Sequence, residues 1–155
     1  MKFMGIPIDG NVDVFCEKLS QNGFVNNECS KDIISLKGLF YGEESLVDVH
    51  FDASTKIVYE VSVSIIKEMD FLTEKIQKSI MNAIEEKYKH KKETVNPKLM
   101  QYNYYIFDQF DPIGMIQTFI IGPYASESLK ESMLSLTYID VENYLMIERK
   151  KRNDI

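Results

Sequence analysis

Asp48, His50 and Asp52 occupy alternate positions in one short segment, and Glu60 follows a few residues later. Because side chains alternate between the two faces of a strand, the first three would share a face, and a short turn would bring Glu60 close to them. Carboxylates that flank an imidazole can bind a divalent cation or orient a general base. This spacing matches no established ligand motif, and charged side chains are equally typical of the solvated face of an antiparallel hairpin. We therefore regard the four residues as a weak polar cluster and assign no catalytic, metal-binding or cofactor-binding residue.

A second candidate group is aromatic and lies in the run from Tyr102 to Phe107. In a strand, Tyr102 and Tyr104 share one face, next to Ile106. Tyr105 and Phe107 share the opposite face. Aromatic side chains are enriched at protein interfaces and can line a ligand groove, although strands also use them in the core. The four tyrosine and phenylalanine residues form our candidate interaction surface.

The other reactive side chains form no recognisable motif. Cys16 and Cys29 have no Cys-x-x-Cys spacing and imply no disulfide framework, and His90 stands among lysines where a helix is expected to end. Neither a Gly-x-Ser-x-Gly elbow nor a glycine-rich phosphate loop occurs. Because an enzyme needs a nucleophile, a base or a metal set, the sequence favours a non-catalytic protein, although catalytic residues can converge without a motif.

The composition predicts one globular domain. The chain has 155 residues, 45% of them hydrophobic, which is enough to bury a single core. Its formal net charge of -6 disfavours a broad grip on nucleic acid, which depends on clustered lysine and arginine. No apolar run reaches the ~18 residues that cross a bilayer, and the start of the chain, with Pro7 and Asp9, lacks the apolar region of a secretory signal. We therefore expect a cytoplasmic protein with no membrane or nucleic-acid partner.

The polar cluster belongs to a predicted hairpin with one buried face. From Val47 to Ile65, apolar residues fall mostly at odd positions, which is the period of a half-buried strand. A helix over 12–22 precedes this hairpin, with Asn11 as its N-cap and Gly23 at its end. A strand over 32–41, with Gly38 as a candidate bulge, leads into it through a turn at 42–44. The connections are too short for a crossover helix, so these three strands should form an antiparallel meander, with the hairpin as one sheet edge of the first helix-and-strands unit.

The second half of the sequence repeats this order. Apolar residues spaced by four predict a helix over 70–89 with Asp70 as its N-cap, and a polar loop covers 91–98. A strand over 102–110, a turn at 111–114 and a central strand over 115–121 come next. After a polar stretch over 126–132, a strand covers 133–139, and Asp140 then begins either a closing helix, which we favour, or a hairpin. The order predicts an α+β fold of antiparallel sheet packed with helices, built from pseudo-duplicated α-β-β-β units plus a C-terminal helix.

Several short segments also carry a resemblance. They are Gly5-Ile6-Pro7-Ile8-Asp9-Gly10, Leu36-Lys37-Gly38, Tyr41-Gly42, Lys87-Tyr88 and Thr137-Tyr138-Ile139-Asp140. In these features the chain resembles a group of small uncharacterised bacterial proteins that begin with the same Gly-Ile-Pro-Ile-Asp-Gly run. The resemblance implies a full-length, single-domain member of unassigned activity and transfers no catalytic residue. The repeated order of helix and strands is also similar to that of β-lactamase-inhibitor-protein-like domains, which lay a concave sheet against a partner.

The sequence leaves three classes of function open. The first, which we favour, is a non-catalytic protein-binding or inhibitory module with an unknown partner. The alternative is a small ligand-binding protein or enzyme with a pocket between a helix and the sheet, and the third is a structural homo-oligomer. A concave, partly apolar exposed face of the sheet would favour recognition, whereas a flat acidic face would favour only a scaffold.

Overall fold

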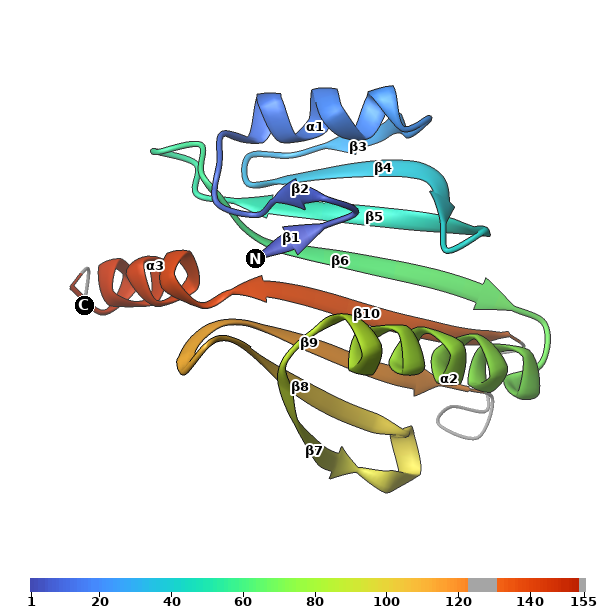
Figure 1. Ribbon diagram of the computed structural model, residues 1–155. Helices are drawn as coiled ribbons and strands as arrows, with labels where there is room; N and C mark the ends of the chain where they lie inside the picture. Colours follow the sequence, from blue (N-terminus) through green and yellow to red (C-terminus); the bar gives the residue numbers. More distant parts are fainter. Residues whose placement is uncertain (123–130, 154–155) are drawn as a thin grey trace.

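A single large antiparallel sheet organises the chain in the computed structural model, which describes residues 1–122 and 131–153. Its strands are β3 (Val25–Cys29), β4 (Ile33–Phe40), β5 (Glu43–Phe51), β6 (Val58–Lys67), β7 (His90–Asn96), β8 (Gln101–Asp108), β9 (Asp111–Ile121) and β10 (Ser132–Asp140). The other elements are β1 (Lys2–Phe3), β2 (Ile6–Pro7), α1 (Val12–Gln21), α2 (Asp70–Lys87), the 3-10 turn η1 (Pro97–Leu99) and α3 (Val141–Asn153). The spatial order of the eight strands is β3-β4-β5-β6-β10-β9-β8-β7 (Figure 1).

Two units of similar order build this sheet. One consists of α1 followed by β3 to β6, and the other consists of α2 followed by β7 to β10. Their last strands, β6 and β10, lie side by side and antiparallel, which joins the two sheets into one. The predicted α+β fold class is therefore confirmed, with one more strand in each unit than we expected. The hairpin of β5 and β6 forms one edge of the first unit, as predicted, and the pairing of β6 with β10 places this edge in the middle of the joined sheet.

The two additional strands are the outermost strands of the sheet. β7 covers most of the segment that we expected to be a loop, and β3 lies in a segment to which we assigned no element. The side chains of both strands are largely exposed and polar. Because an edge strand is held mainly by backbone hydrogen bonds on one side, it needs no apolar alternation, and pattern reading misses it.

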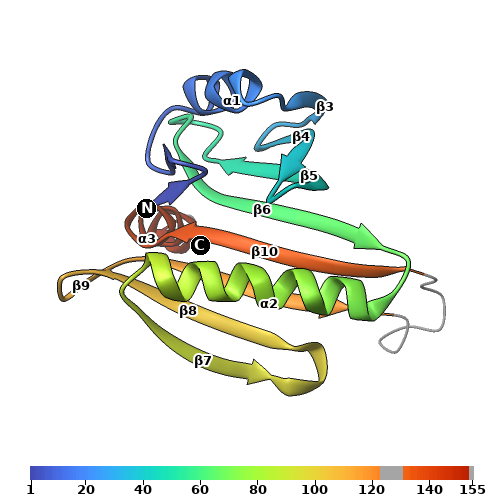
Figure 2. The same ribbon diagram turned by 45° about the vertical axis from the view of Figure 1, so that its right-hand side comes forward.

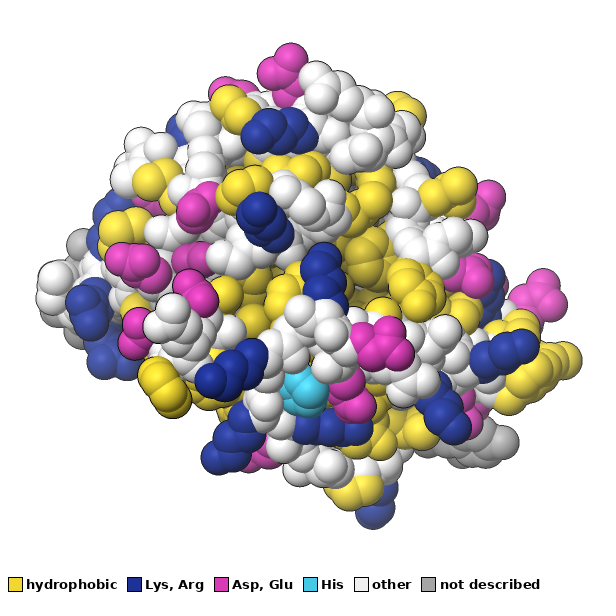
Figure 3. Space-filling view, in the orientation of Figure 1, with side chains coloured by type: hydrophobic (Ala, Val, Ile, Leu, Met, Phe, Trp, Pro, Cys, Tyr) yellow, Lys and Arg dark blue, Asp and Glu magenta, His cyan; other side chains and the backbone are white. Residues whose placement is uncertain are grey.

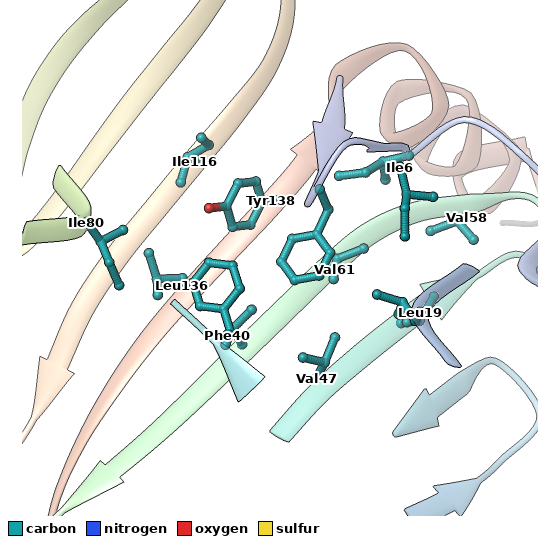
Figure 4. Packing of buried hydrophobic residues seen from close by; sticks show 14 of the residues in the cluster. Ile6, Leu19, Phe40, Val47, Val58, Val61, Ile80, Ile116, Leu136 and Tyr138 are labelled. Atoms are coloured by element: carbon teal, nitrogen blue, oxygen red, sulfur yellow. The ribbon is translucent and has the colours of Figure 1, made fainter. Parts of the chain in front are cut away.

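The α1 and α2 helices cover the same face of the sheet, which we call the inner face. α1 and the β1–β2 hairpin lie over the half that ends in β3, and α2 lies over β6, β10 and β9 (Figures 1 and 2). One apolar core fills the space beneath these elements, with Leu19 of α1 near Val47, and Ile80 of α2 near Leu136 (Figure 4). Within residues 1–122 and 131–153, none of the helices is both long and apolar enough to cross a membrane.

Local sequence signals explain where α1 begins and ends. The side chain of Asn11 accepts a hydrogen bond from the backbone N–H of Asp13 at 2.8 Å, as expected of an N-cap. Gly23 adopts the left-handed conformation, with φ +88°, and the N–H of Phe24 donates to the carbonyl of Leu19 at 3.1 Å. Both predicted caps are confirmed.

The predicted N-cap of α2 is wrong. Asp70 is the first helical residue, and Met69 occupies the cap position without a side-chain hydrogen bond. α2 also buries two polar side chains on its inner face. The Thr73 hydroxyl lies 2.7 Å from the Ser132 hydroxyl, and Gln77 donates to the carbonyl of Met100 at 2.8 Å. Because these groups are satisfied by strand and loop partners, the buried face of α2 is not purely apolar.

The apolar alternation of the β5–β6 hairpin holds except near its turn. The buried side chains are Val47, Val49, Phe51, Val58, Val61, Val63 and Ile65. The register shifts between His50 and Phe51, so that Phe51 pairs with Val58. This bulge buries Val58 in place of the expected Ile57 and Tyr59, because one extra residue reverses which positions face the core.

The remaining expectations concern the second half of the chain. β8 and β9 are joined at residues 109–110, so the predicted turn at 111–114 is wrong and lies inside β9. β9 is central, as predicted, between β10 and β8. Asp140 begins the closing helix α3 and accepts a hydrogen bond from the N–H of Asn143 at 3.1 Å, which excludes the hairpin. The predicted polar stretch over 126–132 lies mostly outside the described residues.

Gly38 is required by packing and not by a bulge. β4 and β5 pair in continuous register through Gly38 and Ser45, so no bulge occurs there. A Cβ atom at Gly38 would lie 2.5 Å from Cδ1 of the Phe24 ring, which packs against the backbone at that point. The glycine therefore lets the Phe24 ring that follows α1 rest on β4.

Replacement of Gly38 by alanine should lower the free energy of unfolding by about 1–3 kcal/mol, because the added methyl group overpacks against Phe24. Urea unfolding measures this difference. Gly10→Ala is the matched control, since a Cβ atom there meets nothing within 4 Å, and its effect should stay within about 0.5 kcal/mol. Equal losses in the two variants would contradict the packing role of Gly38.

Candidate functional site

The face of the sheet opposite α1 and α2, which we call the outer face, carries a continuous row of polar side chains. Residues that lie directly opposite one another on neighbouring strands share a face. Following these pairs across the sheet gives one residue from each strand, and each of them is polar. The members of this polar row are Glu28, Ser35, Asp48, Ser62, Thr137, Gln117, Asn103 and Glu93.

Hydrogen bonds between neighbouring side chains hold parts of the polar row. The Ser35 hydroxyl donates to the carboxylate of Asp48. The amide of Gln117 donates to Asn103 at 2.9 Å. In the middle of the sheet, the hydroxyl oxygens of Ser62 and Thr137 lie 3.4 Å apart across the β6–β10 junction. The row is thus partly organised by its own members.

The structure brings His50 and Glu60 of the predicted weak polar cluster together and gives Asp48 and Asp52 other partners. Asp48 belongs to the polar row and accepts from Ser35. His50 and Glu60 lie opposite each other in the adjacent row, with 3.7 Å between Nε2 and Oε1. Asp52 lies beyond the bulge, in the turn that leads to β6. Among the described residues, no group of three or more histidine, cysteine or acidic side chains is placed to hold a metal ion.

Asp52 organises the turn between β5 and β6. Its Oδ2 atom accepts hydrogen bonds from the Ser54 hydroxyl at 2.7 Å, from the Thr55 N–H at 2.9 Å and from the Thr55 hydroxyl at 2.7 Å. Lys150 of α3 lies 3.4 Å from its Oδ1 atom. The hydrogen bonds from Ser54 and Thr55, followed by the charge of Lys150, hold the pKa of Asp52 well below its usual range.

The four residues of the candidate interaction surface divide between the two faces of the sheet. Tyr104 is fully buried on the inner face, and the half-buried Tyr102 packs against the same core. Tyr105 and Phe107 are half-buried on the outer side of β8. The Tyr105 hydroxyl donates to Glu93 at 2.7 Å, which attaches this ring to the end of the polar row.

Tyr104 forms a hydrogen bond that links the sheet to α2. Its hydroxyl donates to Oε1 of Glu85 at 2.7 Å, and Lys92 lies 3.0 Å from the same oxygen. Burial, together with the hydrogen bond to Glu85, raises the pKa of Tyr104. The hydrogen bonds from Tyr104 and Lys92 lower the pKa of Glu85. In this structure Tyr104 therefore contributes to packing between α2 and β8.

An exposed apolar patch lies on the outer face beside the polar row, and the sequence reading missed it. Val25, Leu39 and Ile66 are 67%, 60% and 56% exposed. With the half-buried Leu46 and Met133 they line a shallow depression of about 710 Å³. We call these five residues the outer apolar patch. Its only sequence signal is a pair of adjacent apolar residues, as in Leu39-Phe40 and Ile65-Ile66, one of which must face outward.

Along its strands, the outer face carries more acidic than basic side chains. Its carboxylates come from Glu28, Glu44, Asp48, Glu60 and Glu93, whereas its lysines are Lys37 and Lys91. Lys37 and Glu44 themselves line the depression. A partner that docks here would therefore meet an apolar centre on a face whose strands carry more carboxylates than lysines.

α3 lies at the other end of the same strands. It follows β10 directly (Figure 1). The rings of Tyr144 and Tyr59 lie 6.4 Å apart between their centroids. Ile66 and Met133 pair with each other at the opposite end of β6 and β10. The outer apolar patch is thus remote from α3 along these strands.

Comparisons of the chain with protein-family models, with curated proteins and with solved structures found no match.

Substitution of Asp52 by asparagine should destabilise the fold by about 1 kcal/mol near pH 7, because the charged acceptor of the β5–β6 turn is lost. Since the pKa of Asp52 is lowered only in the folded state, its stabilisation is complete above the unfolded-state pKa of about 4 and is lost as pH falls. Urea unfolding of both proteins between about pH 7 and about pH 3 should therefore show a converging stability difference. Asp9→Asn, at an exposed position, is the control. A difference that does not depend on pH would contradict this role.

The two cysteine thiols should differ in reactivity. Burial raises the pKa of the Cys16 thiol to about 11, whereas Cys29 is exposed. Because the thiolate is the reactive species, iodoacetamide at about pH 8 should modify Cys29 at least ~10-fold faster than Cys16. Peptide mass spectrometry measures both rates, and in denaturant they should become similar. Equal rates in the folded protein would contradict the protected position of Cys16.

Proposed function

We propose that this chain is a non-catalytic protein-binding or inhibitory module that docks its partner on the outer face of the sheet. The outer apolar patch is the observation that carries the proposal. Large apolar side chains that are more than half exposed lose contact with water when a partner covers them, and such patches mark interaction sites on globular proteins. The sheet supplies a rigid support for them, so little ordering is required on binding.

The charges of the outer face favour a partner whose own docking surface has basic side chains around an apolar centre. The carboxylates of the polar row would attract such a partner and orient it along the strands. A second copy of the same chain would bring the same carboxylates together, which disfavours a symmetric dimer through this face. We therefore favour a different protein over self-association as the occupant.

Replacement of both Leu39 and Ile66 by serine tests this proposal without changing the net charge. The double variant should lose at least ~10-fold in affinity for the partner, or about 1.4 kcal/mol, because the centre of the contact loses its apolar groups. The partner would be recovered by affinity purification from cells that naturally produce the chain, and its affinity measured by calorimetry.

The matched control replaces Val14 of α1 and Phe71 of α2 by serine, since these side chains are 50% and 60% exposed on other surfaces. The control should retain the partner, and binding by the parent chain should weaken as salt concentration rises. A partner that binds both double variants equally, or the recovery of no partner, would contradict docking at the outer apolar patch. So would light scattering that showed a dimer disrupted by Leu39→Ser and Ile66→Ser.

A further inference from the structure

The inner face carries a groove that is separate from the outer apolar patch. It lies between α2 and two hairpin turns, Met4-Gly5 in the β1–β2 hairpin and Tyr41-Gly42 between β4 and β5. Two adjoining depressions of about 330 and 200 Å³ form this groove, and Tyr41 lines both of them. Figure 3 shows apolar side chains gathered in the hollow between α1 and α2.

The floor of the groove is apolar and well packed. Phe40, Ile80, Ile84 and Tyr138 line the smaller depression and are almost completely buried. The rings of Phe40 and Tyr138 meet edge to face with 6.5 Å between their centroids (Figure 4). This largely apolar floor would accept a hydrocarbon chain or a ring.

Both turns at the groove hold a large side chain in an unfavourable backbone conformation. Met4 and Tyr41 have φ angles of +49° and +54°, and each is followed by a glycine with positive φ. Hairpin turns with two positive φ angles favour asparagine, aspartate or glycine, because a larger side chain clashes with its own backbone. Here a methionine and a tyrosine stand at these positions, and both line the groove.

Burial does not explain the choice of these two side chains. Tyr41 remains 51% exposed and Met4 39% exposed, so neither is needed to fill the core. The Tyr41 hydroxyl instead reaches across the groove to the carbonyl of Ser79 on α2, at 3.4 Å. Strained positions that persist without a packing reason are typical of binding sites.

The rim of the groove is basic, although the chain as a whole is acidic. Its charged side chains are Lys2, Lys67, Lys75, Lys87 and Glu43. Glu43 is the one acidic group among these lining residues, and it pairs with Lys67. Lys2, Lys75 and Lys87 are exposed, and they would surround the mouth of an occupied groove with positive charge.

From this combination we propose that the groove binds a small amphiphilic anion. Its apolar chain or ring lies on the floor formed by Phe40, Ile80 and Tyr138, and its carboxylate or similar head group lies among the lysines of the rim. The two depressions, of about 330 and 200 Å³, together have the volume of a typical small-molecule site. This binding is independent of protein docking on the outer face.

Decanoate, titrated below its micelle concentration into the full chain, is the probe for this proposal. We expect saturable binding by calorimetry, with shifts of the methyl signals of Met4, Ile80 and Ile84 in isotope-labelled protein. Decylammonium has the same chain with a positive head group, and it should bind at least tenfold more weakly. Equal binding of the two probes would overturn the role of the lysine rim.

Two variants separate ligand binding from folding. Tyr41→Asn places a favoured residue in the turn, so it should leave the thermal midpoint unchanged or raise it while weakening decanoate binding at least fivefold. Lys75→Glu with Lys87→Glu should weaken binding at least tenfold, whereas Lys18→Glu with Lys31→Glu, an equal charge change at exposed positions outside the groove lining, should not.

Unchanged affinity in Tyr41→Asn or in the Lys75 and Lys87 variant would overturn the proposal. Anionic phosphatidylglycerol vesicles distinguish a free amphiphile from a lipid surface. Sedimentation of the chain with these vesicles, without binding of free decanoate, would also overturn it.

Discussion

The antiparallel pairing of β6 with β10 is the contact on which the rest of the fold depends. It runs from Lys67 with Ser132 to Glu60 with Ile139 and joins two units that lie far apart in the sequence. On the inner face it sets Val63 against Leu136 in the core, and on the outer face it sets Ser62 against Thr137. A slip of one residue would exchange these faces, so the core and the polar row are fixed by the same register.

This pairing also explains why one face of the sheet remains free of α1 and α2. Each unit brings one helix, and the antiparallel junction places both helices on the inner face, where α1 and α2 share a single core. An antiparallel sheet tolerates a solvated outer face, because alternate residues can be polar. The polar row follows from this, whereas the exposure of apolar residues such as Leu39 and Ile66 does not, and that exposure is what supports the proposed docking surface.

The parts of the fold that could be predicted are those controlled by neighbouring residues. The caps at Asn11 and Gly23, and the alternation through Val61 and Val63, are local and were confirmed. The edge strand β7 was missed because pairing on one side needs no apolar face, and Val58 was misassigned because a bulge reverses parity. The pairing of β6 with β10 left no local signal, since it is decided by packing between distant segments.

The candidate site could be predicted from the sequence only in part, for the same reason. Asp48, His50 and Glu60 lie on one face as predicted, and His50 pairs with Glu60. Asp48 instead accepts a hydrogen bond from Ser35, which the alternation could not specify. Leu39 has only its apolar neighbour Phe40 as a signal. The groove has a clearer one, since Met4-Gly5 and Tyr41-Gly42 place a large residue before glycine in hairpin turns that favour small polar residues.

Net charge describes the two faces of this chain poorly. A value of -6 correctly suggests an acidic surface on the outer face, but it hides the lysines that line the inner groove. Salt screens charges over ~8 Å at physiological strength, so a bound ion responds mainly to the charges nearest to it. The lysines that line the groove therefore set the local charge there. The net charge of the whole chain disfavours a long polyanion such as nucleic acid, because such a ligand needs many cations in a line. A single small anion needs only a few lysines at one groove, so the net charge does not disfavour it.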